Sequence, residues 1–263
     1  MEVTATGKGA RINNLREKDR LETIKEKGVL TVIGPPKETP FFYVNPETNA
    51  ISGIDADITT EIARRLEINK FEIKESSFAN LLEQFKTDDS IDIAVGGIFI
   101  TPESEKLVAF TKPLYKESEA VIVPRYSTIN YMSDLKNAVV GVEKGTIFED
   151  LAKKWKENNL IKEIIILEST TELFNALSNG KIDAGLADSI IINSHLSKEK
   201  DPLLRKLKDY TPVLQTTMGI AVKKNDISLL NALNKTIDNM KADSTLNSIL
   251  THNGLDKNNM IMD

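Results

Sequence analysis

Hydrophobic residues along the chain form short β-branched runs that alternate with segments of helical spacing. Apolar runs at residues 29–33 and 91–95 predict buried strands, and the alternating segment around Phe71 predicts another. Between them, apolar residues recur every three or four positions after Asp57 and again over residues 79–86, which predicts two helices. Strand, helix, strand, helix, strand in this order is typical of a parallel sheet covered by helices.

The same order of elements recurs in the second half of the chain. Apolar runs at residues 139–142, 164–167 and 182–187 predict three further strands, separated by two segments of helical spacing. A later run at residues 219–222 precedes two amphipathic segments that are too short for a third domain. We therefore expect two similar α/β lobes, with the C-terminal segments packed back on the first.

The predicted domain limits follow from this repeat. Lobe 1 comprises residues 28–118 and 219–263, and lobe 2 comprises residues 119–218, so the chain crosses between the lobes twice. Residues 1–27 begin with a small, polar stretch that has no periodicity, which predicts a flexible leader, with a short surface helix as an option over residues 15–26. No secretory apolar segment precedes this leader, so we expect that a signal peptide has been removed.

Composition and charge exclude several classes of function. The 263 residues are 40% hydrophobic and 28% charged, as in ordinary globular proteins. The net charge of −5 argues against nucleic acid, which requires a basic patch, and no apolar run approaches the ~18 residues that span a bilayer. With no cysteine and only His195 and His252, we expect no metal site, no Ser-His-Asp triad and no cofactor.

Several segments in the correct order carry a resemblance to a known family. They are GVLTVIG, TPFFYV, GIDADI, DIAVGGIFITPESEK, FTKPLY, GVEKGTIFED, NGKIDAGLAD and MGIAVKKND. Together they span about residues 28–255 and resemble the extracellular solute-binding proteins of the amino-acid type (family 3), the binding components of ABC importers.

This resemblance implies an α/β, two-lobed periplasmic-binding-protein-like fold. Two three-layer lobes would be joined by two crossing hinge strands near residues 118–120 and 217–219, and would close on a ligand in the cleft. The resemblance also implies a non-enzymatic, monomeric protein that delivers a small solute to the membrane subunits of an ABC importer. Its location would be extracytoplasmic, in the periplasm or as a cell-surface lipoprotein.

Two positions of lobe 2 are candidates for ligand binding. Gly145 and Thr146 follow a strand and open a helix, where free N–H groups favour an anion, although an ordinary helix cap is the alternative. Asp188 follows the strand at residues 182–187, at the end where open α/β sheets bind ligands, although a loop aspartate is usually a solvated turn residue. The resemblance implies that the first pair holds a ligand carboxylate and that Asp188 accepts hydrogen bonds from a ligand ammonium.

Lobe 1 contributes a second group of candidates. The resemblance implies that Gly97, Phe99 and Thr101 receive the ligand ammonium through backbone carbonyls and a hydroxyl. Phe78 stands where the family often places an aromatic platform able to attract a cation, although the bare residue is as well explained by core packing. Phe41 is a further candidate, with packing as its alternative.

Two departures from the family pattern point to an unusual ligand. Amino-acid binders normally read Thr-Pro-Glu-Arg where this chain has TPESEK, and a serine hydroxyl at Ser104 cannot replace the planar, charged arginine that holds the α-carboxylate. Losing such a pair costs about 1.5–3 kcal/mol. Glu38 stands where some members carry a stacking aromatic, although it could equally be a solvated loop residue. If Glu38 and Asp188 both face the cleft, the acidic pocket favours a cationic or amine-bearing ligand without an α-carboxylate.

Other functions remain open on the same fold. One alternative is a receptor or sensor domain that keeps ligand-driven closure. Another is a cyclohexadienyl-dehydratase-like enzyme with a cleft carboxylate as general acid, against which Ser104 argues because its acidic substrate needs a carboxylate clamp. A descendant that binds no ligand is the last alternative.

Overall fold

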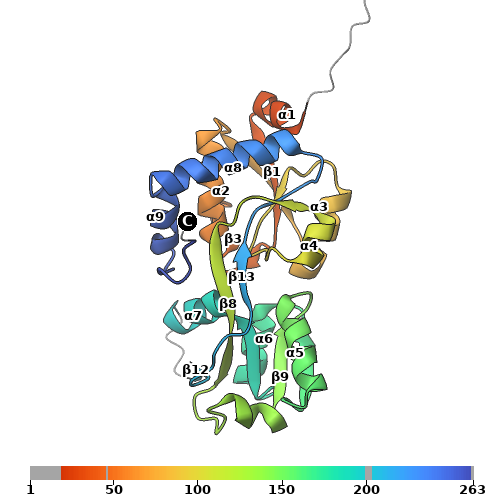
Figure 1. The fold of residues 1–263 in the computed structure, drawn as a ribbon, viewed down its shortest axis with the longest axis vertical. Helices are drawn as coiled ribbons and strands as arrows, with labels where there is room; N and C mark the ends of the chain where they lie inside the picture. The colour runs from red at the N-terminus through yellow and green to blue at the C-terminus, as the bar shows by residue number, and fades with distance from the viewer. Residues whose placement is uncertain (1–18, 46, 199–202, 262–263) are drawn as a thin grey trace, which may run out of the picture.

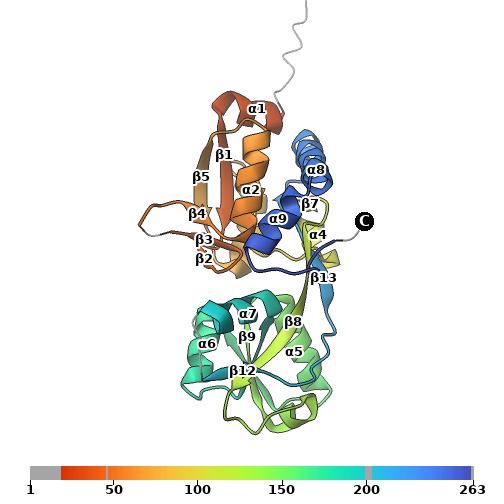
Figure 2. The ribbon, with the colours of Figure 1, turned by 90° about the vertical axis from the view of Figure 1, so that its left-hand side faces the viewer.

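The computed structural model describes residues 19–45, 47–198 and 203–261. Two α/β lobes lie one above the other, and two neighbouring extended strands run between them (Figure 1). A view turned by 90° shows the same two bodies (Figure 2). The two-lobed α/β fold class that the sequence predicts is confirmed.

Helices surround the sheets, and two short 3-10 helices are labelled η. The helices are α1 (Arg20–Lys27), α2 (Ile54–Arg65), η1 (Phe78–Asn80), α3 (Leu81–Thr87), α4 (Pro102–Leu107), η2 (Met132–Asn137), α5 (Ile147–Glu157), α6 (Thr170–Ser178), α7 (Ser189–Lys198), α8 (Ile227–Ala242) and α9 (Thr245–His252). The strands are β1 (Val29–Gly34), β2 (Lys37–Glu38), β3 (Phe42–Val44), β4 (Ile51–Ser52), β5 (Lys70–Glu75), β6 (Ile93–Ala94), β7 (Ala109–Phe110), β8 (Tyr115–Pro124), β9 (Val139–Glu143), β10 (Glu163–Leu167), β11 (Ala184–Asp188), β12 (Leu204–Lys206), β13 (Gln215–Met218) and β14 (Ala221–Val222).

Lobe 1 is built on a sheet with the strand order β5-β1-β6-β14-β7. β1 lies parallel to β5 and β6, whereas β14 runs antiparallel to β6 and β7. Because side chains alternate across a strand, Val32 packs in the cluster that includes the apolar faces of α2 and α8, and Ile33 packs in the cluster that includes α3. The sheet is therefore covered by helices on both faces.

Lobe 2 has the strand order β10-β9-β11-β8-β12. β9 is parallel to β10 and β11, and β8 is antiparallel to β11 and β12. Val121 of β8 lies in the same apolar cluster as Leu151 and Trp155 of α5, and the next residue, Ile122, lies with Leu173 of α6. This lobe is also a helix, sheet, helix sandwich.

β8 and β13 are the strands that connect the two lobes. The first residues of β8 pair antiparallel with β13, from Tyr115 opposite Met218 to Ser118 opposite Gln215. The later residues of β8 enter the lobe 2 sheet by pairing with β11 and β12. The expected crossing points, near residues 118–120 and 217–219, lie on or beside these strands.

Residues 20–27, which the sequence assigns to a flexible leader, form helix α1 on the surface of lobe 1. Asp19 and Glu22 make a capping box, in which the Glu22 N–H donates to Asp19 Oδ1 at 2.9 Å. Ile24 is only 1% exposed, because it belongs to the lobe 1 core. The short surface helix that the sequence offers as an option over residues 15–26 is therefore present as α1 over residues 20–27, and it packs on lobe 1. Residues 1–18 lie outside the described ranges.

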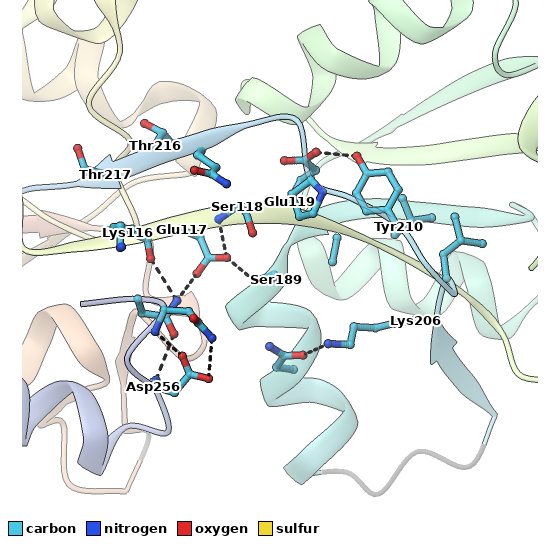
Figure 3. A pocket seen from close by; sticks show the side chains of 18 of the residues that line it. Lys116, Glu117, Ser118, Glu119, Ser189, Lys206, Tyr210, Thr216, Thr217 and Asp256 are labelled. Atoms are coloured by element: carbon cyan, nitrogen blue, oxygen red, sulfur yellow. Dashed lines mark hydrogen bonds between the residues drawn. The ribbon is translucent and has the colours of Figure 1, made fainter. Parts of the chain in front are cut away.

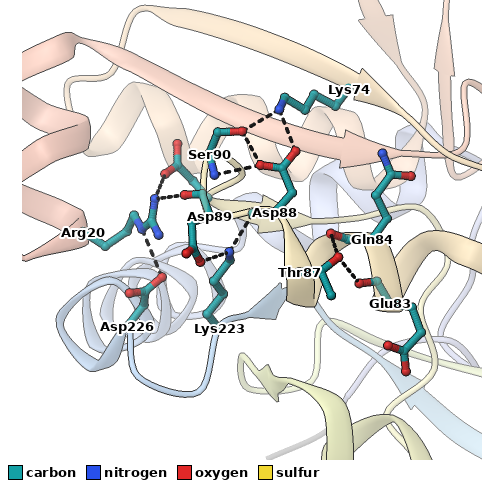
Figure 4. Close-up of polar contacts among 11 residues, drawn as sticks. Arg20, Lys74, Glu83, Gln84, Thr87, Asp88, Asp89, Ser90, Lys223 and Asp226 are labelled. Atoms are coloured by element: carbon teal, nitrogen blue, oxygen red, sulfur yellow. Dashed lines mark hydrogen bonds and ion pairs between the residues drawn. The ribbon is translucent and has the colours of Figure 1, made fainter.

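Arg20 fixes the start of α1 to the body of lobe 1 (Figure 4). Its guanidinium donates to the Asp89 carbonyl at 2.7 Å and pairs with Asp226 at 3.2 Å and Asp92 at 3.4 Å. Asp226 immediately precedes α8, so this contact joins two segments that are 206 positions apart in the sequence. Such a contact cannot be read from local sequence pattern.

Short strands differ most from the sequence prediction. β6 is limited to Ile93–Ala94, although the apolar run covers residues 91–95, because Gly96 and Gly97 turn the chain with φ angles of 118° and 74°. β2, β3 and β4 form a small separate sheet whose strands are too short to show a period. Within the described ranges, no helix has the length and apolar character needed to cross a membrane.

Candidate functional site

Residues of both lobes line a small cavity between them, which we call the inner cavity. Its volume is about 20 Å³. It brings together most of the predicted site: Phe41, Phe78, Gly97, Phe99, Thr146 and Asp188. The sequence prediction did not include the other side chains that line it: Glu143, Phe148, Thr170, Ala187 and Ile191.

A larger outer cavity of about 300 Å³ adjoins the inner one. The two share Phe78, Phe99 and Thr146, and the outer one adds the predicted residues Thr101, Ser104 and Gly145. A volume near 300 Å³ lies at the lower end of the range for small-molecule sites. The two cavities together therefore form a candidate ligand site between the lobes.

Asp55 organises the lobe 1 wall of the inner cavity. Its carboxylate accepts hydrogen bonds from the N–H groups of Gly96 at 3.0 Å and Gly97 at 2.7 Å, and from the Tyr115 hydroxyl at 2.7 Å. Burial raises the pKa of this carboxyl, against the three hydrogen bonds, which lower it. Asp55 thus holds the Gly96–Gly97 turn against the first residue of hinge strand β8.

Thr101 and Ser104 are occupied by capping helix α4. Thr101 is the N-cap, whose hydroxyl accepts from the Ser104 N–H at 3.1 Å, and the Thr101 N–H donates back to Ser104 Oγ at 3.0 Å. The Ser104 hydroxyl also lies 2.9 Å from the Phe99 carbonyl oxygen. Both hydroxyls therefore face their own backbone, and neither supplies a positive charge to the outer cavity.

Aromatic side chains of the two lobes pack against each other at the site. Phe99 of lobe 1 packs edge-on against Phe148 of lobe 2, with ring centroids 5.6 Å apart. Phe41 stacks on Tyr115 at 6.3 Å, and it is fully buried, so it combines the packing role with a place in the cavity wall. Phe78 is half-buried and borders both cavities.

The Gly145–Thr146 turn lies at the start of α5, as the sequence predicts, but the Gly145 N–H is already engaged. The Gly145 N–H donates to the Glu149 carboxylate at 2.8 Å, and the Thr146 hydroxyl caps the Glu149 N–H. A Cβ at Gly145 would lie 2.9 Å from the Ala79 Cα, so the lobes can come this close here only because this residue is glycine. A ligand anion that accepts from the Gly145 N–H would have to displace the Glu149 carboxylate.

Asp188 ends β11 and lies at the start of α7. It is 2% exposed, and its Oδ1 accepts from the Ile190 N–H at 2.8 Å. The carboxylate therefore caps the helix and lines the inner cavity at the same time. Capping of α7 alone would also explain why an aspartate stands at this position.

Glu143 is a cavity residue that sequence reasoning missed. It ends β9, it is 7% exposed, and its Oε2 accepts a hydrogen bond from the Thr170 hydroxyl at 2.6 Å. The sequence signal was its place directly before Lys144 and Gly145, at a strand end. A strand pattern alone does not tell whether such a residue faces the cleft or the solvent.

Glu38 is a predicted site residue of which the structure describes only the backbone. Its backbone pairs with Phe42 in the small sheet of β2, β3 and β4. The side chain lies outside what the structure describes, so the prediction that Glu38 faces the cleft remains a prediction.

A third cavity, of about 1060 Å³, lies beside the hinge strands (Figure 3). Glu117 of β8 accepts hydrogen bonds there from the Ser189 hydroxyl at the start of α7 and, at 3.3 Å, from the Asn259 side chain of the C-terminal segment. Burial is the main reason why the pKa of Glu117 is raised to about 7. This buried carboxylate joins the hinge strand to both lobes.

Metal binding is not indicated by the described part of the chain. There, no three histidine, cysteine, aspartate or glutamate side chains are grouped so that they could hold an ion. The inner cavity offers carboxylates, hydroxyls, backbone groups and aromatic rings. The outer cavity adds the Lys153 ammonium, which pairs with Glu149 at 2.6 Å.

Solved structures of amino-acid-binding proteins share this fold. A substrate-binding protein of an amino acid ABC transporter from Streptococcus pneumoniae, bound to L-arginine, is 27% identical with a TM-score of 0.79, covering 90% of this chain and 98% of its own. A mutant of ArgBP from T. maritima is 28% identical with a TM-score of 0.77, covering 88% and 97%. The fold and the interlobe site together define a two-lobed solute-binding protein.

The chain belongs to the bacterial extracellular solute-binding proteins, family 3, which it matches over residues 30–254. An arginine-binding protein of an Escherichia coli ABC transporter is 29% identical over 202 residues, covering 76% of this chain and 81% of the relative. A glutamine-binding protein of a Bacillus subtilis ABC transporter is 27% identical over 238 residues, covering 89% and 84%. The family resemblance of the sequence is therefore confirmed.

Proposed function

We propose that this protein captures a small amino-acid-like or amine-bearing solute between its lobes and delivers it to the membrane subunits of an ABC importer. The observation that carries the proposal is the inner cavity, where Asp188 of lobe 2 meets Gly97 and Phe99 of lobe 1. The names of the relatives, which are binding proteins of ABC transporters, support the same role.

The proposed ligand contacts are the predicted residues that line the two cavities. They are Phe41, Phe78, Gly97, Phe99, Thr101, Ser104, Gly145, Thr146 and Asp188. Glu38 stays a candidate from the sequence alone. The proposed lobe limits are residues 28–118 with 219–263, and residues 119–218, with α1 added to lobe 1 because Ile24 packs there.

The chemistry of the site favours a positively charged ligand. Ser104 replaces the arginine that would hold an α-carboxylate, and its hydroxyl caps α4. The α5 turn, which would be the second anion site, already binds the Glu149 carboxylate. The arginine named for several relatives and neighbours is a cation and is consistent with this preference.

Binding rather than catalysis is the role that the relatives support. A neighbour described as an ancestral amino-acid-binding protein, a precursor of cyclohexadienyl dehydratase, is 25% identical with a TM-score of 0.76. Because this neighbour is a precursor of an enzyme, catalysis stays the alternative function, although the neighbour itself is described as a binding protein. Because the family consists of extracellular solute-binding proteins, we infer that the chain works outside the cytoplasm, either free or held at the cell surface by a lipid.

A thermal-shift panel tests this proposal. The panel comprises amino acids, carboxylate-free amines, quaternary ammonium compounds and small organic acids. A ligand at about 100 times its Kd stabilises the folded state by about 2.7 kcal/mol, which raises the melting temperature measurably. We expect amines and cationic amino acids to raise it, and organic acids to leave it unchanged.

The matched variant is Asp188→Asn. Asparagine caps a helix as well as aspartate does, so the fold at the start of α7 should persist while the charge is lost. We expect this variant to keep its melting temperature in buffer and to lose the response to amines. A panel to which the wild-type chain shows no response, or an equal response in the variant, would contradict the proposal.

A further inference from the structure

The C-terminal segment lies against hinge strand β8. It follows helix α9, which packs on α2 of lobe 1, where the Asn253 side chain donates to the Asp57 carboxylate at 2.9 Å. Leu255 is buried in the core, and the chain then turns, with the Asn259 N–H donating to the Asp256 carbonyl at 3.0 Å. The segment that reaches β8 is therefore fixed to lobe 1.

Asn259 binds β8 through both its backbone and its side chain. The Lys116 N–H donates to the Asn259 carbonyl at 2.7 Å, and the Asn259 side-chain amide donates to the Lys116 carbonyl at 3.1 Å. The same amide donates to the Glu117 carboxylate at 3.3 Å. One residue of the C-terminal segment thus makes three hydrogen bonds to the hinge strand.

Glu117 continues this contact into lobe 2 (Figure 3). Its other carboxylate oxygen accepts from the Ser189 hydroxyl, and backbone N–H groups at the start of α7 add further hydrogen bonds. Ser189 directly follows Asp188, which lines the inner cavity. Because Glu117 is 3% exposed, water competes little for these hydrogen bonds.

The strand pairing places the bend between the lobes beside Glu117. On β8, Glu117 pairs with Thr216 of β13, whereas Glu119 already pairs with Asp188 of β11 in the lobe 2 sheet. A rotation of lobe 2 about residues 117–119 therefore moves the start of α7 relative to the C-terminal segment. Since hydrogen bonds weaken steeply with distance and angle, the Glu117 carboxylate contacts both partners only when the lobes lie close together.

We propose that Asn259, Glu117 and Ser189 form a latch that holds the lobes together in the absence of ligand. The latch runs from lobe 1 through the hinge strand to lobe 2, and it adds to the packing of Phe99 on Phe148. It shifts the equilibrium between closed and open lobes, because its contacts are made in one state and lost in the other. The inference goes beyond the proposed function, since it concerns the ligand-free chain.

Pulsed electron resonance on the ligand-free chain tests the latch. Spin labels at Lys86→Cys on α3 and Lys154→Cys on α5 report the distance between the lobes, since both positions are exposed and the chain has no cysteine of its own. At pH 8, above the raised pKa of about 7, the Glu117 carboxylate is ionised. We expect a short-distance population in this labelled chain. In Asn259→Ala, the ratio of short to long distances should fall by about tenfold, as for a lost hydrogen bond to a charged group.

Asn258→Ala is the matched control. The Asn258 side chain is exposed and donates to Asp256 at 3.4 Å, so the same change is made one position away in the same turn without touching β8. We expect this variant to keep the ratio of the labelled parent chain. A ratio that falls equally in both variants, a ratio that Asn259→Ala leaves unchanged, or a parent chain without a short-distance population would overturn the inference.

Ser189→Ala tests the latch from the side of lobe 2. It should also lower the ratio, and combining it with Asn259→Ala should lower the ratio by less than the product of the two single effects, because contacts through one carboxylate are not independent. Effects that multiply would mean two separate contacts and would contradict a single latch. Since no ligand is present, a negative result leaves the proposed solute capture standing.

Discussion

Ser104 stands where the family resemblance implies an arginine, and in the structure it caps helix α4. Its hydroxyl and backbone close the capping box of α4 with Thr101. Nothing in this arrangement offers a fixed cation to an α-carboxylate. The side chain nevertheless borders the outer cavity, so a longer residue at this position can extend into that cavity.

Replacing Ser104 with arginine should therefore shift the preference of the site toward α-amino acids. We expect Ser104→Arg to bind glutamine at least about tenfold more tightly than the wild-type chain does, because guanidinium–carboxylate pairs are charge-assisted and bidentate. Titration calorimetry gives the two affinities.

The control for this change is Ser104→Ala, which also loses the capping box but adds no charge. It should destabilise α4 by about 0.5–2 kcal/mol without raising glutamine affinity. If the arginine variant binds glutamine no better than the alanine variant, the missing arginine does not explain ligand preference at this site.

Strand β8 has contacts with both lobes. It pairs with β13 between the lobes and then enters the lobe 2 sheet. Glu117 on this strand contacts Ser189 of α7 and Asn259 of the C-terminal segment, and the following residue donates its N–H to the same carboxylate at 2.8 Å. The hinge strand is thereby linked to both lobes through one buried acid.

Folding stability should depend on pH through Glu117. Burial raises the pKa of its carboxyl to about 7 from an ordinary value of 4.5, so the folded chain binds the proton more strongly than the unfolded chain does. The contribution of Glu117 to the free energy of unfolding should then be largest below pH about 4.5, fall as pH rises toward about 7, and level off above it, by about 3 kcal/mol in total.

Urea denaturation across this pH window, with wild type and Glu117→Gln compared, measures the effect. The glutamine variant should lack this part of the pH dependence, so that the difference in unfolding free energy between the two proteins changes between pH about 4.5 and about 7. Glu105→Gln, at an exposed position of α4, is the matched control and should follow the wild type. Parallel curves for wild type and Glu117→Gln would contradict the assignment.

Element type and order were largely predictable from the sequence. The runs at residues 29–33 and 182–187 correspond to β1 and β11, since long β-branched or apolar runs between turn signals identify buried strands. α1 was predicted only as an option over residues 15–26, and the β2–β4 sheet was not predicted. Contacts with distant residues, such as that of Arg20 with Asp226, help to hold α1 in place. Local periodicity contains no information about such contacts.

The candidate ligand site was also predictable in part, where its residues lie at the ends of strands. Gly145, Thr146 and Asp188 lie at strand ends, where the fold class locates ligand sites, and all three border the cavities. Glu143 was missed because one residue of register decides which way a strand-end side chain points. The contact of Asp55 with Tyr115, 60 positions away, likewise depends on the folded arrangement of lobe 1.

At the scale of the whole molecule, the two lobes are in contact around the site. Phe99 packs on Phe148 and Gly145 lies against Ala79, while the inner cavity has the volume of about one water molecule. An amine or amino acid is several times larger than that, so it must enter while the lobes are apart. We expect that bending of β8 and β13, the strands that connect the lobes, is the motion that separates them.

The distance between the lobes, measured with and without ligand, tests the central claim most directly. Since the chain has no cysteine, Lys86→Cys on α3 and Lys154→Cys on α5 place two spin labels at exposed positions on opposite sides of the cleft. Pulsed electron resonance should show a longer, broader distance distribution in buffer, and a shorter, narrow one with saturating 1,5-diaminopentane or arginine. The same labels in Asp188→Asn should show no shortening. A distribution that neither ligand changes in the wild-type background would contradict solute capture by closure of the two lobes.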